Sequence, residues 1–148
     1  MAEDIIEKAF AELEANIDQD ELYLADYQTA LVQQLENCDP EKYIRRVFGL
    51  FEKYPSADWG MPGELVHYLE SLDGVLRERE LIASVERCPV SHTLWMLNRQ
   101  CNSKRTKEEA EPYCGIFRAV MERDGISDGI RNEVRSYLDY QSRRLGNL

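Results

Sequence analysis

Apolar residues recur at three- and four-residue spacings along the whole chain, which is the period of an amphipathic helix. No segment alternates apolar and polar residues between turn residues, as a half-buried strand would. The connections are about two to six residues long, and such short connections place consecutive helices side by side. The pattern therefore predicts an all-α fold of about seven helices in antiparallel hairpins. They would form a compact array or a short curved solenoid, in a single helical domain over residues 1–148.

Capping residues indicate where the helices begin. Asp18 with Glu21 three residues later has the form of a capping box, and it predicts a helix over 18–37 that follows one over 3–16. Proline suits the first helical position, because the amide that it lacks has no partner there. Further starts are expected at Asp39 with Pro40, at Pro62, at Ser91, at Thr106 (or nearer Glu111, because of Pro112) and at Ser127.

One face of each expected helix is apolar and predicts the core. The four cysteines fall inside or at the end of these apolar patterns without a C-x-x-C pair, so we expect reduced core residues and neither a disulfide nor a metal. The cysteines are Cys38, Cys88, Cys101 and Cys114, and the expected core positions are Leu24, Leu31, Leu35, Ile44, Val47, Phe48, Phe51, Leu65, Val66, Leu69, Leu72, Leu81, Ile82, Val85, Val90, Leu94, Leu97, Tyr113, Phe117, Val120, Met121, Ile130, Val134, Tyr137, Leu138, Gln141 and Leu145.

The stretch DWGMPGELVHYLES, residues 58–71, brings an Asp, a Trp, a Glu and one of two histidines together. It has the composition of a catalytic loop. Yet a proline at the first helical position, an acid in the first turn and an apolar stripe behind them also describe the start of a helix. We favour the helix start, with the glycines allowing a tight approach of the loop. His67 is left either half-buried or facing a partner.

Catalytic and cofactor motifs are missing from the sequence. It has no G-x-S-x-G, no H-E-x-x-H, no phosphate-binding glycine loop and no G-x-G-x-x-G. Cys88 and His92 could form a nucleophilic pair only if the fold arranged them. We therefore predict that the protein is not an enzyme and binds no cofactor.

The acidic charge is concentrated at one end. Residues 1–41 hold 12 acidic residues against the single Lys8, a net charge of −11, whereas residues 42–148 have a net charge of +1. Such a region repels nucleic acid and favours a basic protein partner, although it could also serve only to keep the protein soluble. The N-terminus lacks the pattern of a signal peptide, and no apolar run has membrane-spanning length. We expect a cytoplasmic monomer or weak dimer.

Acids and tyrosines share a stripe of the second expected helix, where tyrosine offers contact area and carboxylates attract basic side chains. A strip around Trp95, Asn98 and Arg99 is a weaker candidate, because a packed Trp with polar residues at its rim explains it too. The predicted partner-binding residues are Asp20, Tyr23, Asp26 and Tyr27 on the stripe, with Asp58 and Trp59 in the loop.

Two sequence blocks over about residues 54–102 look familiar from a known protein family: D-W-G-x-P-G-x-L-V-H and T-x-W-M-L-N-R. The stretch RNEVRSYLDYQ follows them along the chain. The chain resembles the small all-helical immunity proteins of bacterial polymorphic toxin systems, in particular those of contact-dependent growth inhibition. The resemblance implies a protein that stays in the producing cell and binds a cognate toxin domain, covering its active site or substrate surface. The acidic charge fits a basic nuclease toxin. The alternative is a helical adaptor or chaperone-like regulator that binds a cytoplasmic protein.

Overall fold

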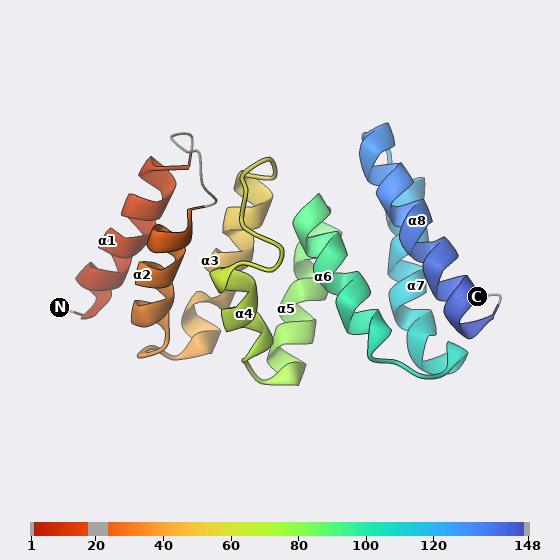
Figure 1. Cartoon of the computed structure of the whole chain (residues 1–148), viewed down its shortest axis with the longest axis horizontal. Helices are drawn as coiled ribbons and strands as arrows, with labels where there is room; N and C mark the ends of the chain where they lie inside the picture. Colours follow the sequence, from red (N-terminus) through yellow and green to blue (C-terminus); the bar gives the residue numbers. More distant parts are fainter. Residues whose placement is uncertain (1, 18–23, 147–148) are drawn as a thin grey trace. The chain divides into compact units, whose positions relative to one another are not determined.

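The computed structural model describes residues 2–17 and 24–146, and within them it contains eight α-helices and no strand (Figure 1). The all-α prediction is confirmed, with eight helices in place of about seven. The choice between a compact array and a solenoid stays a prediction. The helices are α1 (Ala2–Ala15), α2 (Ala25–Leu35), α3 (Pro40–Lys53), α4 (Glu64–Glu70), α5 (Gly74–Arg87), α6 (Ser91–Asn102), α7 (Lys107–Glu122) and α8 (Asp128–Leu145).

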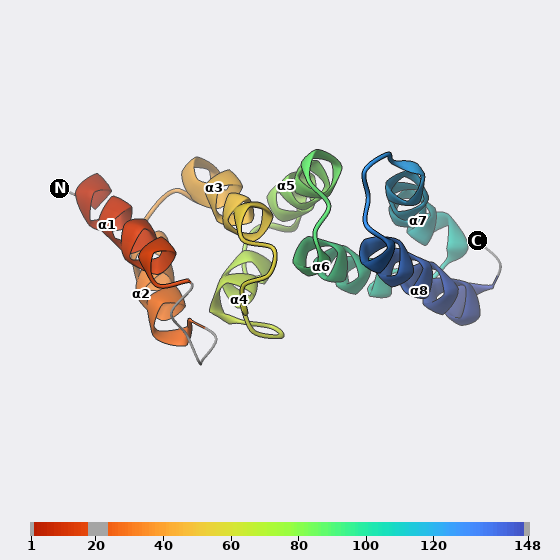
Figure 2. The ribbon, with the colours of Figure 1, turned by 90° about the horizontal axis from the view of Figure 1, so that it is seen from above.

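The chain forms two compact units, residues 1–80 and residues 81–148, and the boundary falls inside α5. In the first unit α2 packs against both α1 and α4, and in the second unit α8 packs against both α6 and α7. Figure 2 shows α1 and α3 on one side of the first unit and α2 and α4 on the other. The single domain over residues 1–148 stays a prediction.

Three predicted helix caps are confirmed. The carboxylate of Asp39 accepts a hydrogen bond from the amide of Glu41 at 3.1 Å. The hydroxyl of Thr106 accepts from the amide of Glu109 at 3.2 Å. Ser127 accepts from the amide of Ile130 at 3.1 Å. Each side chain satisfies an amide that has no partner within the first turn of its helix, which is why these residue types mark helix starts.

Other predicted starts are wrong. The Asp18 and Glu21 capping box lies outside the described residues, and α2 begins only at Ala25, because Leu24 has a φ of 28° that a helix cannot contain. α4 begins at Glu64 with Gly63 as its cap, so the expected role of Pro62 as first helical residue is wrong.

Ser91 is the first residue of α6 and not its cap, because its hydroxyl donates to the carboxylate of Glu133 at 2.7 Å. The alternative start of α7 near Glu111 is also wrong. The Thr106 cap fixes an earlier start, and Pro112 lies inside the helix.

The predicted apolar faces form the core. Most of the expected core positions are buried, and seven are only half-buried: Leu72, Ile82, Met121, Ile130, Tyr137, Leu138 and Leu145. The cysteine prediction is half right, because Cys101 and Cys114 are buried while Cys38 and Cys88 are only half-buried. Burial raises the pKa of the Cys101 thiol to about 11.

Candidate partner-binding face

Trp59 belongs to the core of the first unit. It is 1% exposed, and its ring meets Phe51 edge to face with centroids 5.4 Å apart. The indole N–H donates to the carbonyl of Tyr54 at 3.2 Å, which supplies the polar partner that a buried Trp needs. The structure thus corrects the proposal of Trp59 as a partner-binding residue, because its side chain faces the interior.

Gln28 on α2 fixes the loop before α4. Its side chain is fully buried, its Nε2 donates to the carbonyl of Trp59 at 3.2 Å, and its Oε1 accepts from the amide of Leu65 at 3.2 Å. Gly63 completes the arrangement, since a Cβ there would lie 1.6 Å from the Trp59 carbonyl oxygen. These contacts explain the conspicuous D-W-G-x-P-G block as a packing motif that holds the start of α4 against α2.

Basic residues of the first unit are confined to three helices. All seven of them lie on α1, α3 and α5, and residues 24–39 and 54–73, which include α2 and α4, contain none. Those two segments hold seven acidic residues. The acids are Asp26, Glu36, Asp39, Asp58, Glu64, Glu70 and Asp73. The sequence analysis noted the acidic excess but not these base-free segments, and the structure adds that α2 and α4 lie on the same side of the unit (Figure 2).

On the α1 and α3 side, acids are paired with bases. Arg46 of α3 forms an ion pair with Glu7 of α1. Lys53 lies 3.1 Å from the carboxylate of Glu14, which also accepts a hydrogen bond from Tyr54 at 2.9 Å. Burial opposes the charge of Glu14, but the bonds from Tyr54 and Lys53 outweigh it and lower the pKa of this carboxyl. These acids stabilise the unit internally.

On the other side of the unit, several side chains project into solvent from segments without a base. Tyr27 is 38% exposed beside Asp26 on α2, and Met61 is 71% exposed in the loop. Asp58 is exposed too, and its carboxylate accepts from the amide of Gly60 at 3.0 Å. We use the term α2/α4 face for the exposed residues Asp26, Tyr27, Asp58, Met61, Glu64 and His67.

The predicted stripe is described only in part. Asp20 and Tyr23 lie outside the described residues, whereas Asp26 and Tyr27 are exposed as expected. His67, which the sequence left undecided, is exposed on α4. Met61 was missed, since a single loop methionine has no periodic pattern that would reveal whether it is buried.

The strip on α6 is divided by packing. Asn98 is buried, and its side-chain oxygen accepts from Gln141 of α8 at 2.8 Å. Trp95 is half-buried, and the guanidinium of Arg99 lies 4.8 Å from the centre of its ring. This favours the packing interpretation for Asn98 and leaves Trp95 and Arg99 as a smaller surface feature.

Comparison with known proteins adds no relative, since no family model, no curated protein and no solved structure matches the chain. Within residues 2–17 and 24–146, no helix is both long and apolar enough to cross a membrane. The same residues contain no group of three or more His, Cys, Asp or Glu side chains arranged to hold a metal ion. The α2/α4 face is the candidate surface with the clearest physical character, because the segments that form it carry seven acids and no base.

Proposed function

We propose that the protein binds a basic protein partner through the α2/α4 face. The observation that carries this proposal is the separation of charge within the first unit. Bases are paired with acids on α1 and α3, and they are absent from the segments that contain α2 and α4. A surface of one sign raises the rate of encounter with an oppositely charged protein and disfavours partners of like charge.

The partner that fits best is a toxin domain, with the chain acting as its immunity protein. A nuclease toxin needs a basic surface to hold the phosphates of RNA or DNA. A face that offers carboxylates together with Tyr27 and Met61 can cover such a surface, because Tyr and Met are enriched in protein interfaces. The resemblance to immunity proteins points the same way.

The first test is to identify the partner. An immunity gene is expected directly beside the gene of the large secreted toxin that it neutralises, and the toxin domain from that neighbour should bind the purified chain. If the gene has no such neighbour and affinity capture recovers a basic cytoplasmic protein of the host, the adaptor alternative replaces the immunity proposal.

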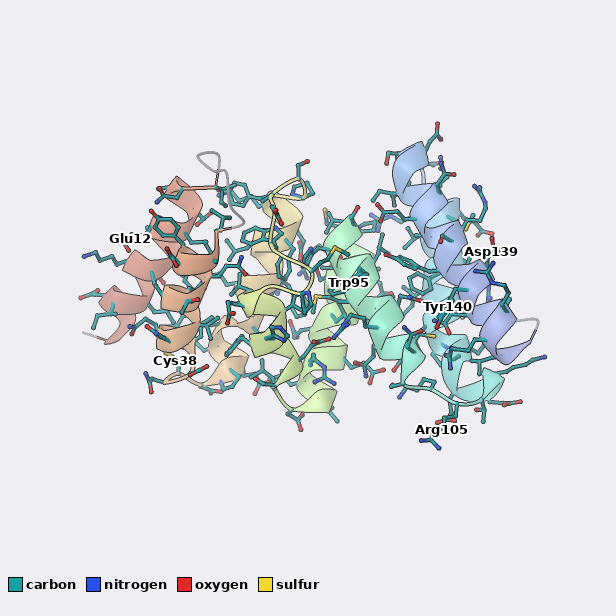
Figure 3. All side chains as sticks on the ribbon, viewed as in Figure 1. Glu12, Cys38, Trp95, Arg105, Asp139 and Tyr140 are labelled. Carbon is teal, nitrogen blue, oxygen red and sulfur yellow. The ribbon has the colours of Figure 1, made fainter. Side chains whose placement is uncertain are left out.

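The second test locates the surface. Changing Asp26→Lys and Glu64→Lys together should weaken toxin binding by about tenfold or more and reduce its dependence on salt. The matched control changes Glu12→Lys and Asp139→Lys, which are also exposed but lie on α1 and α8 (Figure 3).

The control pair should keep nearly full affinity, although the total charge changes by the same amount. A melting curve for each variant separates binding from folding, since both Asp26 and Glu64 lie in first turns, where an acid stabilises the helix. Equal losses in the two pairs would show that only net charge matters. Unchanged affinity of the Asp26 and Glu64 pair at low and high salt, with a normal melt, would place the binding surface elsewhere.

A further inference from the structure

A cavity of about 470 Å³ opens on the surface of the second unit, along α7 and beside the end of α5, and Glu86, Pro112 and Ala119 in its lining are exposed. This volume is within the range of small-molecule sites, about 300 to 1,000 Å³. Most of its walls are apolar, and two charged residues stand among them. The lining residues are Glu86, Pro112, Gly115, Ile116, Ala119, Val120 and Arg123.

The cavity exists because α7 carries small or helix-disfavouring residues on this side. Pro112 and Gly115 both lie inside the helix and both line the cavity, although proline and glycine are the two residue types that a helix interior accepts least. A Cβ at Gly115 would meet no atom within 4 Å, so nothing within the fold requires a glycine there. Pro112 and Gly115 lower the stability of α7. Both lie where a larger side chain or a regular helical turn would narrow the cavity.

Arg123 supplies the polar end of the cavity. One of its N–H groups donates to the carbonyl of Glu86 at 2.6 Å, which holds the guanidinium at the rim. A guanidinium has further N–H donors in the same plane, and these suit a carboxylate. The Glu86 side chain is exposed to solvent on the same rim. The second unit carries 11 basic and 9 acidic residues, so its overall charge does not oppose an anion.

We propose that this cavity binds a small apolar monocarboxylate, with the hydrocarbon part against Ile116 and Val120 and the carboxylate at Arg123. The apolar walls would be removed from water by the hydrocarbon, and the guanidinium would fix its orientation. This site belongs to the second unit and does not depend on the α2/α4 face, so it holds or fails separately from the proposed partner binding.

The test uses decanoate as the probe and decanol as its uncharged counterpart, each titrated into the whole chain by calorimetry. Decanoate should bind saturably at millimolar concentration or below, and decanol more weakly. Gly115→Leu fills the cavity and should abolish the binding of both compounds. Because leucine suits a helix and nothing crowds position 115, this variant should melt at the same temperature as the unchanged protein or higher.

Arg123→Gln should weaken decanoate about tenfold and leave decanol unchanged, as expected when one charged hydrogen bond is lost. The control is Arg118→Gln, since Arg118 is on the same helix, pairs with Glu111 and does not line the cavity. It should bind decanoate normally. The proposal is overturned if the unchanged protein shows no saturable binding, if Gly115→Leu binds as well as the unchanged protein, or if the two arginine variants behave alike.

Discussion

Among the described residues, each unit buries one glutamine, and the two glutamines are used in different ways. In the first unit, Gln28 binds only backbone, the carbonyl of Trp59 and the amide of Leu65. In the second unit, Gln141 binds only side chains, donating to Asn98 and Asn102 and accepting from Arg144 at 2.6 Å. A buried glutamine must satisfy both ends of its amide, and a chain can meet that need by fixing a loop or by building a side-chain network.

Arginine holds helix ends in both units, and the units differ more in the balance of acids and bases. In the second unit Arg144 donates to the carbonyls of Cys101 and Lys104, at the end of α6, and Arg131 donates to the carbonyls of Met121 and Arg123, at the end of α7. These bonds help to satisfy carbonyls at or just beyond the ends of the two helices. In the first unit Arg77 likewise donates to the carbonyls of Glu70 and Leu72, at the end of α4. Arg46 and Arg79 of that unit pair with carboxylates, as Arg118 of the second unit does with Glu111. The first unit holds 7 basic residues against 19 acidic ones, so acids remain for a partner after these pairs are made.

The largest effect is expected from Gly63→Ala, which attacks the loop that Gln28 fixes. The new methyl group would lie 1.6 Å from a backbone oxygen, and backbone cannot move aside as a side chain can. We expect a loss of about 3 kcal/mol or more in the free energy of unfolding, measured by urea denaturation. Gly49→Ala is the matched control, because it lies in α3 with no atom within 4 Å of the added Cβ. It should be neutral or stabilising, and equal losses in the two variants would contradict the packing role of Gly63.

Replacing each buried glutamine with leucine compares the two units directly. Gln28→Leu leaves a buried amide and a buried carbonyl of the backbone without their partner, at about 1 to 3 kcal/mol each. Gln141→Leu should cost less, because Asn102 is exposed and can turn to water, and Arg144 keeps its bonds to carbonyls. Urea denaturation of the two variants gives the order. A larger loss for Gln141→Leu would show that the side-chain network matters more than the fixed loop.

Thiol labelling separates buried from half-buried cysteines. The rise in the pKa of Cys101 from about 9 to about 11 lowers its reactive thiolate fraction about a hundredfold at neutral pH. Burial also raises the pKa of Cys114. We expect Cys38 and Cys88 to react first with a maleimide in the native protein, and the two buried cysteines to follow only on unfolding. Mass spectrometry of timed samples checks this, and early labelling of Cys101 would contradict its placement in the core.

Sequence reasoning recovered what depends on neighbours along the chain. The caps at Asp39, Thr106 and Ser127 and the apolar faces follow from spacing within a few residues, and they were found. The sequence predictions failed where the burial of a residue depends on residues far away in the sequence. The burial of Trp59 depends on Gln28, 31 residues earlier, and no local signal connects the two.

The α2/α4 face likewise has features that the sequence could predict and features that it could not. The exposure of Asp26 and Tyr27 was predictable from the helical period of α2. The exposure of Met61 and the position of α2 and α4 on one side of the unit required the positions of all the helices in that unit.

The smallest effect concerns the acids that stabilise the first unit internally. Glu14 has a lowered pKa in the folded state, so its bonds to Tyr54 and Lys53 add stability above the unfolded pKa, about 4.3, and lose it as the pH falls through the folded value. Glu14→Gln should therefore cost roughly 0.5 kcal/mol at pH 7, because solvent screens the pair, and less at pH 3. Urea denaturation at both pH values measures the difference. An equal loss at both would mean that Glu14 acts through packing and not through its charge. It would weaken the contrast between these internally paired acids and the α2/α4 face, whose segments contain no base.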